Sequence, residues 1–171
     1  MINIIVFFHL FAFFPNGSAY ITYEQRNKDY SFVINKNEKI SRKQIKDGYV
    51  EQFIIKDIKD TLKSYVITVS KLLVPSKDFT ENTLLSEEYK QGLIQNCNCN
   101  VIDVQKKEYT NFSGVVYKIK AKSSNKSVLG YTVATLKNGS LYNISFMSSE
   151  ALFSAFEPEF EILLTSMKIN K

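Results

Sequence analysis

The sequence predicts an α+β fold with a largely antiparallel sheet, and three observations support that prediction. Residues 127–137 and 140–147 have the composition of strands and are separated by Asn138-Gly139, a pair typical of a two-residue hairpin turn. Apolar residues then recur at helical spacing towards the end of the chain, and they do so again near residues 79–95. A run of strands, a helix, hairpin-joined strands and a closing helix are together typical of α+β domains.

A two-residue turn at Asn138-Gly139 places Lys137 opposite Ser140 and so determines the register of the predicted hairpin. A slip of one residue would exchange its two faces. One face then carries bulky cross-strand pairs: Tyr131–Phe146, Val133–Ile144 and Thr135–Tyr142. The other face is small and mixed, with the pairs Gly130–Met147, Thr132–Ser145, Ala134–Asn143 and Leu136–Leu141. The bulky face therefore needs a cover.

The last apolar stripe indicates the helix that provides this cover. Pro158 disfavours helix at the preceding Glu157 and suits the first position of a helix. We therefore predict a short turn at 149–156 and a C-terminal helix near 158–168 that packs on the bulky face. The stripe consists of Leu152, Phe153, Phe156, Phe160, Leu163, Leu164 and Met167.

The N-terminal half has the patterns of four strands. The polar segment 36–48 is predicted as a connection with turn character. Residues 50–65 also fit a helical period, but 49–56 has a strand pattern, and we favour the strand. Pro75 ends the last of the four. The predicted strands are 20–25, 29–35, 49–56 and 64–74.

A helix near 79–95 is predicted from its start signal and its apolar stripe. Asp78 followed by Glu81 has the form of a reciprocal N-terminal cap, and Gly92 is a weak position within the helix. Strands near 100–109 and 115–122 follow it. The apolar stripe of this helix consists of Leu84, Leu85, Tyr89, Leu93 and Ile94.

The N-terminus has the pattern of a secretory signal peptide. Met1 to Phe14 contains no charged residue and is short for a membrane-spanning helix, which needs about 20 residues. Small residues at Gly17 and Ala19 favour cleavage after Ala19. We expect a signal peptide at 1–19 and a single domain at 20–171, in a secreted and periplasmic protein. Since no Lys or Arg precedes the apolar run, an uncleaved N-terminus that anchors the chain in a membrane is the alternative.

The composition argues against an enzyme. His9 is the only histidine, and cleavage would remove it. Ser-His catalysis, Cys-His catalysis and His-ligated metal sites are then excluded. We predict no catalytic, cofactor-binding or metal-binding residue. The net charge of +5 favours weak attraction to anionic surfaces but is no signature of nucleic-acid binding.

Cys97 and Cys99 are separated by one residue. In an extended strand their Cα atoms would lie roughly 6.5 Å apart, near the upper limit for a disulfide. A turn would bring them closer, and an oxidising compartment would favour the bond. A local disulfide, two unpaired thiols, and a redox or dimer-forming pair remain alternatives. A structural zinc site needs four ligands and is rejected.

Lysines gather in the second half of the chain and would share a surface if strands 100–109 and 115–122 pair. One interpretation is a solvated face or an edge that lysines guard against aggregation. The other is a site for an anionic partner. Arginine, the usual residue for specific phosphate or base recognition, is missing there. The lysines are Lys106, Lys107, Lys118, Lys120, Lys122 and Lys126.

The C-terminal 40 residues resemble the PsbP-like superfamily, which includes the extrinsic PsbP protein of photosystem II, the Ran-binding Mog proteins and small secreted bacterial proteins. The resemblance implies an α-β-α sandwich. Its last helix usually closes on a Ser-Phe pair, where this chain has Ser166-Met167. No catalytic residue carries over from it. The segments that carry it are 130–131, 137–139, 141–146, 156–160 and 163–167.

We therefore predict a non-enzymatic binding or accessory protein that contacts a protein partner in the cell envelope. No nucleic acid is expected as a partner, and a membrane only through an uncleaved N-terminal segment. The alternative is a carrier of a lipid or small apolar ligand between sheet and helix. The predicted interaction face is the small side of the hairpin, formed by Gly130, Thr132, Ala134, Asn143 and Ser145.

Overall fold

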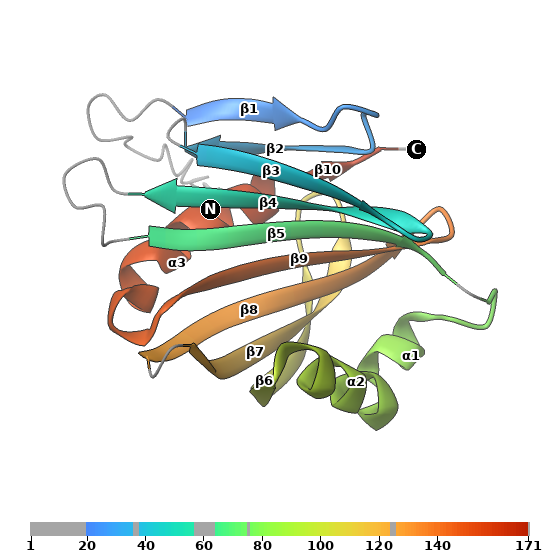
Figure 1. Cartoon of the computed structure of the whole chain (residues 1–171). Coiled ribbons are helices and arrows are strands. Elements are labelled where there is room, and N and C mark those ends of the chain that lie inside the picture. The colour runs from blue at the N-terminus through green and yellow to red at the C-terminus, as the bar shows by residue number, and fades with distance from the viewer. Residues whose placement is uncertain (1–19, 36–37, 57–63, 75, 124–125, 171) are drawn as a thin grey trace, which may run out of the picture.

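The computed structural model describes residues 20–35, 38–56, 64–74, 76–123 and 126–170. Most of these residues form two antiparallel sheets (Figure 1). The smaller sheet has the order β1-β2-β10, with β1 (Tyr20–Glu24), β2 (Tyr30–Asn35) and β10 (Lys168–Ile169).

The larger sheet has seven strands in the order β3-β4-β5-β9-β8-β7-β6. All of its neighbouring strands are antiparallel. Its strands are β3 (Glu38–Ile45), β4 (Gly48–Lys56), β5 (Ser64–Leu73), β6 (Cys99–Glu108), β7 (Ser113–Ser123), β8 (Lys126–Lys137) and β9 (Ser140–Ser149).

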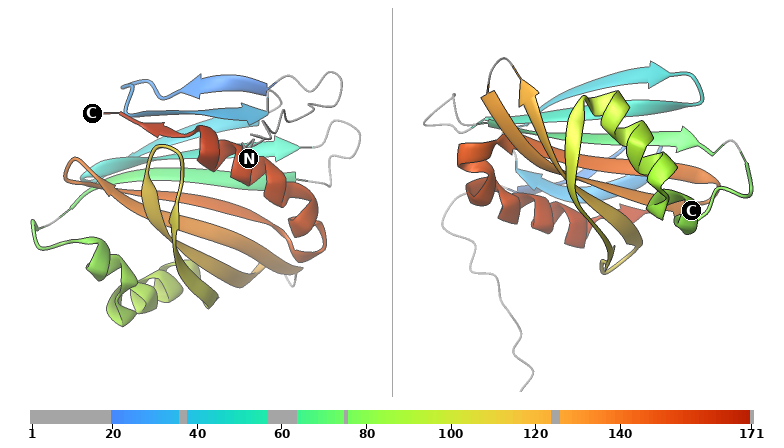
Figure 2. Two further views of the ribbon diagram at one scale, coloured as in Figure 1. Left: turned by 180° about the vertical axis from the view of Figure 1, so that it is seen from behind. Right: turned by 90° about the horizontal axis from the view of Figure 1, so that it is seen from below.

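Helices lie on both faces of the large sheet (Figure 2). One face is covered by α3 (Phe153–Ser166), which follows a 3-10 turn at Glu150–Leu152, together with the small sheet. The opposite face carries α1 (Glu81–Leu85) and α2 (Glu87–Cys97) at its β6-β7-β8 end. The predicted α+β fold with a largely antiparallel sheet is confirmed. The separate small sheet was not predicted.

The predicted hairpin is confirmed residue by residue. Asn138 and Gly139 have φ angles of 52° and 68°, as a turn that matches the strand twist requires. Tyr131 pairs with Phe146 and Thr132 with Ser145. Because the turn chemistry is local, the sequence was sufficient to place these pairs.

The start of the C-terminal helix was predicted wrongly. α3 begins at Phe153 and includes Pro158, whereas the prediction placed a turn at 149–156. The ring of Phe153 lies 5.7 Å from that of Phe146, and Phe156 lies 4.9 Å from Tyr65. Phe153 is buried and Phe156 is half-buried, so together they contribute about 2–4 kcal/mol, which offsets the cost of about 3 kcal/mol for an interior proline.

The helix near 79–95 is present but divided at Ser86, which ends α1 and begins α2. The Ser86 hydroxyl donates to the Thr83 carbonyl (2.7 Å) and accepts from the Tyr89 backbone N–H (3.2 Å). The predicted Asp78–Glu81 cap is wrong, because α1 has Thr80 as its N-cap residue and Thr83 Oγ1 accepts from the Thr80 N–H (3.1 Å). A serine that serves both helix ends allows the chain to bend there.

Two predictions in the N-terminal half differ in outcome. The predicted connection 36–48 contains β3, an edge strand held by pairing with β4 rather than by burial, which explains why its sequence lacks an apolar period. The strand interpretation of 49–56 is confirmed by β4. Residues 57–63 lie outside the described part of the chain.

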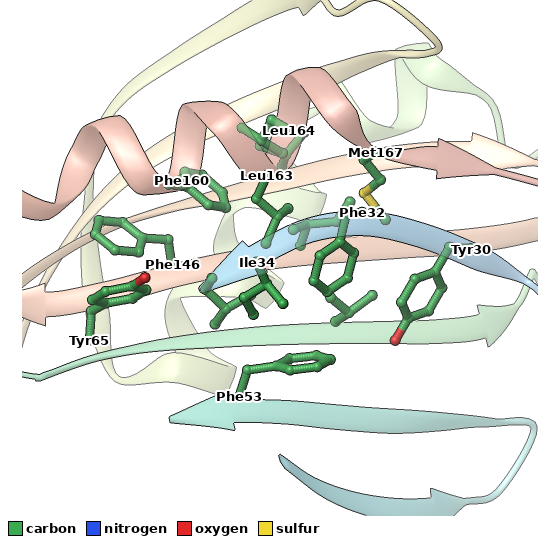
Figure 3. Close-up of a cluster of buried hydrophobic side chains, with 14 of the residues drawn as sticks. Tyr30, Phe32, Ile34, Phe53, Tyr65, Phe146, Phe160, Leu163, Leu164 and Met167 are labelled. Atoms are coloured by element: carbon green, nitrogen blue, oxygen red, sulfur yellow. The ribbon is translucent and has the colours of Figure 1, made fainter. Parts of the chain in front are cut away.

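The core between α3 and the two sheets is rich in aromatic rings (Figure 3). The ring of Phe160 stacks on Phe146 at 5.1 Å, and Phe32 meets Phe53 edge-on at 5.3 Å. Met167, which occupies the position of the usual phenylalanine, is fully buried. The predicted packing of the last helix on the bulky hairpin face is therefore confirmed.

Candidate binding surface and groove

Helix α2 covers its side of the sheet thinly. None of its side chains is fully buried, and its contact with the sheet is made by the half-buried Tyr89, Leu93 and Cys97. The neighbouring α1 is better anchored, because Leu84 is buried and its carbonyl accepts a hydrogen bond from the buried Tyr117 hydroxyl. Burial raises the pKa of Tyr89 to about 12.

The residues of the predicted interaction face fall into two groups. Gly130, Thr132 and Ala134 are buried, with Met147 lying over Gly130 and the α1-α2 cluster over Ala134. Asn143 and Ser145 stay half-buried on β9. The face is thus divided between a covered part and a part that borders the edge of α2.

A hollow lies at that edge, between α2 and strands β5, β9 and β8. We call it the α2 groove. Its volume is about 420 Å³, within the usual range of ligand pockets. Its lining holds no charged residue and is formed by Leu72, Tyr89, Gly92, Leu93, Asn96, Thr132, Leu141, Asn143 and Ser145.

Four polar side chains of the α2 groove are hydrogen-bonded in two pairs. Tyr89 donates its hydroxyl hydrogen to Asn143 Oδ1 (3.1 Å). Thr132 Oγ1 lies 2.9 Å from Ser145 Oγ, within hydrogen-bond distance. Because these groups satisfy each other, the groove offers mainly apolar surface to a ligand.

A second hollow of about 350 Å³ lies beside the Asn138-Gly139 turn. We call it the turn hollow. Its lining includes two exposed cations, Lys77 and Lys137, and no carboxylate. The remaining lining residues are Val74, Ser76, Phe79, Leu136, Asn138, Gly139 and Ser140.

Beyond the α2 groove, the α2 side of the large sheet is open. No helix of the described chain lies over β3, β4 and β5 on this side (Figure 1). Cross-strand pairing aligns one polar row that runs from β3 to β8. That row consists of Ser41, Gln52, Thr68, Ser145 and Thr132.

We call the outward side chains of β3, β4 and β5 the open face. Among the side chains that the structure describes on this face there is no Asp or Glu, and Lys39 and Lys43 lie at its β3 edge. Apart from the exposed Gln52, its centre is half-buried and made of Ser, Thr, Val and Ile side chains. The open face consists of Lys39, Ser41, Lys43, Val50, Gln52, Ile54, Val66, Thr68 and Ser70.

Cys97 and Cys99 form a disulfide with Cα atoms 5.2 Å apart. Asn98 between them adopts the left-handed conformation, with φ 48°, and its backbone N–H donates to the Ile94 carbonyl. This turn, rather than an extended strand, brings the sulfurs together. The bond therefore connects the end of α2 to the start of β6.

Three of the six lysines of the second half form ion pairs within the chain. Strands β6 and β7 pair as expected, but Lys106 and Lys107 form ion pairs with Glu81 (2.8 Å) and Glu161 (2.7 Å). Lys120 likewise pairs with Glu150 at 2.7 Å. These contacts favour the interpretation of a solvated, locally neutralised surface.

A buried polar cluster joins the small sheet to β4 and was not anticipated from the sequence. Glu51 is 1% exposed and accepts hydrogen bonds from the hydroxyls of Tyr23 (3.0 Å) and Tyr30. Arg42 lies 3.4 Å from its other oxygen. Burial and the nearby Glu51 raise the pKa of both tyrosines. A buried glutamate needs such partners, so the cluster is explained by the burial of Glu51 and needs no functional role.

A small polar hollow of about 180 Å³ lies between α3 and β6. Tyr131 donates its hydroxyl hydrogen to Glu157 (2.6 Å), and Lys107 donates to Glu161 (2.7 Å). Burial raises the pKa of Tyr131, and the hydrogen bond to Glu157 adds to this. Its acids thus already have partners in the chain.

The described residues hold no group of three or more His, Cys, Asp or Glu side chains placed to bind a metal ion. No helix among them has the length and apolarity needed to cross a membrane. The predicted signal peptide at 1–19 lies outside the described residues.

No protein-family model matches the chain, and no curated protein matches its sequence. Solved structures do match. The structure of LpqN, involved in cell envelope biogenesis of Mycobacterium tuberculosis, superposes with a TM-score of 0.59 at 12% identity, over 91% of this chain and 93% of LpqN. The solution structure of cyanobacterial PsbP (CyanoP) from Synechocystis sp. PCC 6803 gives 0.59 at 12% identity, over 91% and 95%.

The chain has a PsbP-like fold. The resemblance expected from the hairpin and the closing helix is thereby confirmed at the level of fold. A third match is PA94 of Pseudomonas aeruginosa, a protein of unknown function, with a TM-score of 0.51 at 9% identity over 83% of this chain and 91% of that one. Because PsbP-like folds at such low identity can host different roles, function must be argued from the surface of this chain.

Proposed function

We propose that the chain is a non-enzymatic accessory protein of the cell envelope that binds a protein partner through its open face. The observation that carries the proposal is the unequal cover of the sheet, in which α3 closes one face and α2 leaves β3, β4 and β5 open on the other. The envelope location is supported by the likeness to LpqN, by the apolar N-terminus and by the Cys97–Cys99 disulfide.

The composition of the open face supports a neutral or acidic partner surface. Val50, Ile54 and Val66 are half-buried apolar side chains on either side of the Gln52–Thr68 pair, and they give a partner some apolar surface to bury. Lys39 and Lys43 add positive charge at one edge, and no acid opposes them among the described residues of that face. Complementary charge favours the encounter with an acidic surface.

The test is a cross-linking pull-down from the envelope fraction of cells that express the tagged full chain. Thr68 lies in the middle of the open face, so Thr68→Glu places a charge where partner side chains would have to pack. We expect this variant to lose a partner that the unchanged chain captures. The matched control is Ser154→Glu on the exposed side of α3, which should capture the same partner.

Capture of a protein does not support the proposal unless Thr68→Glu abolishes it and Ser154→Glu does not. If both variants capture the partner equally, the open face is not the interface. If the unchanged chain captures nothing from intact envelopes, the accessory function is wrong.

A second candidate function is that of a carrier for a lipid or small apolar ligand. The α2 groove favours it, because its volume of about 420 Å³ and its uncharged lining suit such a ligand. A thermal-shift screen of lipids tests it. A ligand that raises the melting temperature with the logarithm of its free concentration, once that concentration exceeds Kd, would support the carrier function, as binding to the folded state requires.

A further inference from the structure

We propose that the α2 groove and the turn hollow together form one site for a single-chain anionic amphiphile, such as a medium-chain fatty acid. The alkyl chain would occupy the α2 groove, and the carboxylate would lie in the turn hollow. This inference rests on the carrier function and names its ligand class.

The two hollows adjoin each other. Phe79 lines the turn hollow and packs edge-on against Tyr89 of the α2 groove, with ring centroids 6.2 Å apart. Leu136 of the turn hollow pairs across β8 and β9 with Leu141 of the α2 groove. A ligand longer than either hollow would therefore extend from one into the other along the same side of the sheet.

The α2 groove has the chemistry of a site for an alkyl chain. Its apolar surface comes from Leu72, Leu93 and Leu141. The Tyr89–Asn143 and Thr132–Ser145 hydrogen bonds already pair four of its polar groups, and an alkyl chain in the groove would leave both pairs intact. Gly92 widens the groove, since a Cβ at this position would meet no atom within 4 Å.

The turn hollow has the chemistry of a site for an anion. Lys77 and Lys137 approach from different segments of the chain, one before α1 and one at the end of β8. Asp78 is the nearest acid in sequence, but it accepts a hydrogen bond from Ser76 (3.3 Å) and does not line the hollow. Lysine ammonium groups act as point charges and suit a small carboxylate.

The first experiment measures how affinity depends on the length of the alkyl chain. The full chain is titrated with octanoate, decanoate and dodecanoate below their micelle concentrations, and the methyl NMR signals of Leu72, Leu93 and Leu141 are followed. Leu163, a buried residue of α3 in the core on the opposite face of the sheet, is the internal control, and its signal should not shift. We expect the affinity to rise by about fourfold for each methylene that enters the groove.

The second experiment separates the role of the ligand's alkyl chain from that of its carboxylate head group. Gly92→Leu fills the α2 groove, and dodecanoate should no longer bind. Its control is Gln95→Leu, which adds the same side chain at an exposed position of α2 and should bind normally. Replacing both lysines, Lys77→Gln with Lys137→Gln, should lower the affinity for dodecanoate by about three- to tenfold. The affinity for the neutral dodecanol should stay unchanged.

Each outcome decides a different claim. If dodecanol binds as tightly as dodecanoate and the lysine variant binds both normally, the carrier function survives but the anionic head group is wrong. If Gly92→Leu still binds dodecanoate, or the Leu163 methyl shifts with the others, the proposed site is wrong. If none of octanoate, decanoate and dodecanoate binds, both the proposed site and the carrier function are wrong. The protein-partner function is tested separately by Thr68→Glu.

Discussion

The two helical layers of this protein differ in how tightly they cover the sheet. On one side, α3 buries Phe153, Phe160, Leu163 and Leu164 against strands of both sheets. On the other side, no side chain of α2 is buried to that extent, and a groove of about 420 Å³ remains beside it. The α3 side therefore supplies most of the packing, and the α2 side supplies the surface available for binding.

The difference follows from the composition of the two helices. α3 has apolar residues on a broad stripe, whereas the 11 residues of α2 include only three large apolar side chains, Tyr89, Leu93 and Ile94. A narrow apolar stripe cannot cover the width of several strands, since adjacent strands lie about 4.8 Å apart. The same seven-stranded sheet thus has a dense core on one face and a shallow surface on the other.

The largest expected effect tests the contrast between these layers directly. Phe160→Ala removes a fully buried ring that stacks on Phe146 at 5.1 Å and should lower the free energy of unfolding by about 3–5 kcal/mol. Leu93→Ala on α2 should lower it by about 1 kcal/mol, because Leu93 is only half-buried. Urea denaturation measures both values. Equal losses would show that α2 is as important for stability as α3.

A second variant tests whether the polar cluster adds to the stability of the α3 side. Glu51→Ala leaves the hydroxyls of Tyr23 and Tyr30 without their acceptor, which should cost about 2–3 kcal/mol in the same urea assay. Glu150→Ala is the control, because it removes an exposed partner of Lys120 and should leave stability nearly unchanged. A loss as small as that of the control would mean that water replaces Glu51.

Alkaline pH should weaken the folded state through its tyrosines. Burial, with the nearby Glu51, raises the pKa of Tyr30 above its ordinary value of 10.0, and burial raises that of Tyr89 to about 12. Above about pH 10 the unfolded chain releases these protons first, so the free energy of unfolding falls as the pH rises.

Urea denaturation between pH 8 and pH 11.5 measures this fall. Tyr30→Phe should make the decline with pH shallower, because the variant has one fewer tyrosine with a raised pKa on the α3 side. A free energy of unfolding that stays constant above pH 10 would show that the pKa values of these tyrosines are not raised in the folded state.

The smallest expected effect is a gain in stability on the α2 side. Gly92 lies inside α2, and a Cβ there meets no atom within 4 Å. Gly92→Ala should therefore raise the free energy of unfolding by up to about 1 kcal/mol. Thermal unfolding measures the gain. A loss of stability instead would show that α2 needs its glycine for packing.

The elements differ in how well the sequence predicted them. The hairpin register was correct because an Asn-Gly turn acts within a few residues. The start of α3 was wrong because the rings that outweigh Pro158 come from β5 and β9. β3 was missed since an edge strand needs no apolar period, and the small sheet was missed because β10 has only two residues.

The candidate site was only partly visible in the sequence. Thr132, Asn143 and Ser145 were predicted to share a face, and all three line the α2 groove. Leu72 and Gly92 belong to that groove as well, but they come from β5 and from α2. No local pattern links these segments, so the groove could not have been found without the fold.

By itself, the sequence determined which residues lie on each side of the hairpin and that its bulky side needs an apolar cover. Both depend on turn chemistry and side-chain alternation, which act over a few residues. Only the tertiary structure decided that one face is closed by α3 and the small sheet while α2 leaves the other partly open. That outcome depends on the width of the sheet relative to the apolar surface of each helix. The sheet is built from strands along the whole chain, so no local pattern contains this information.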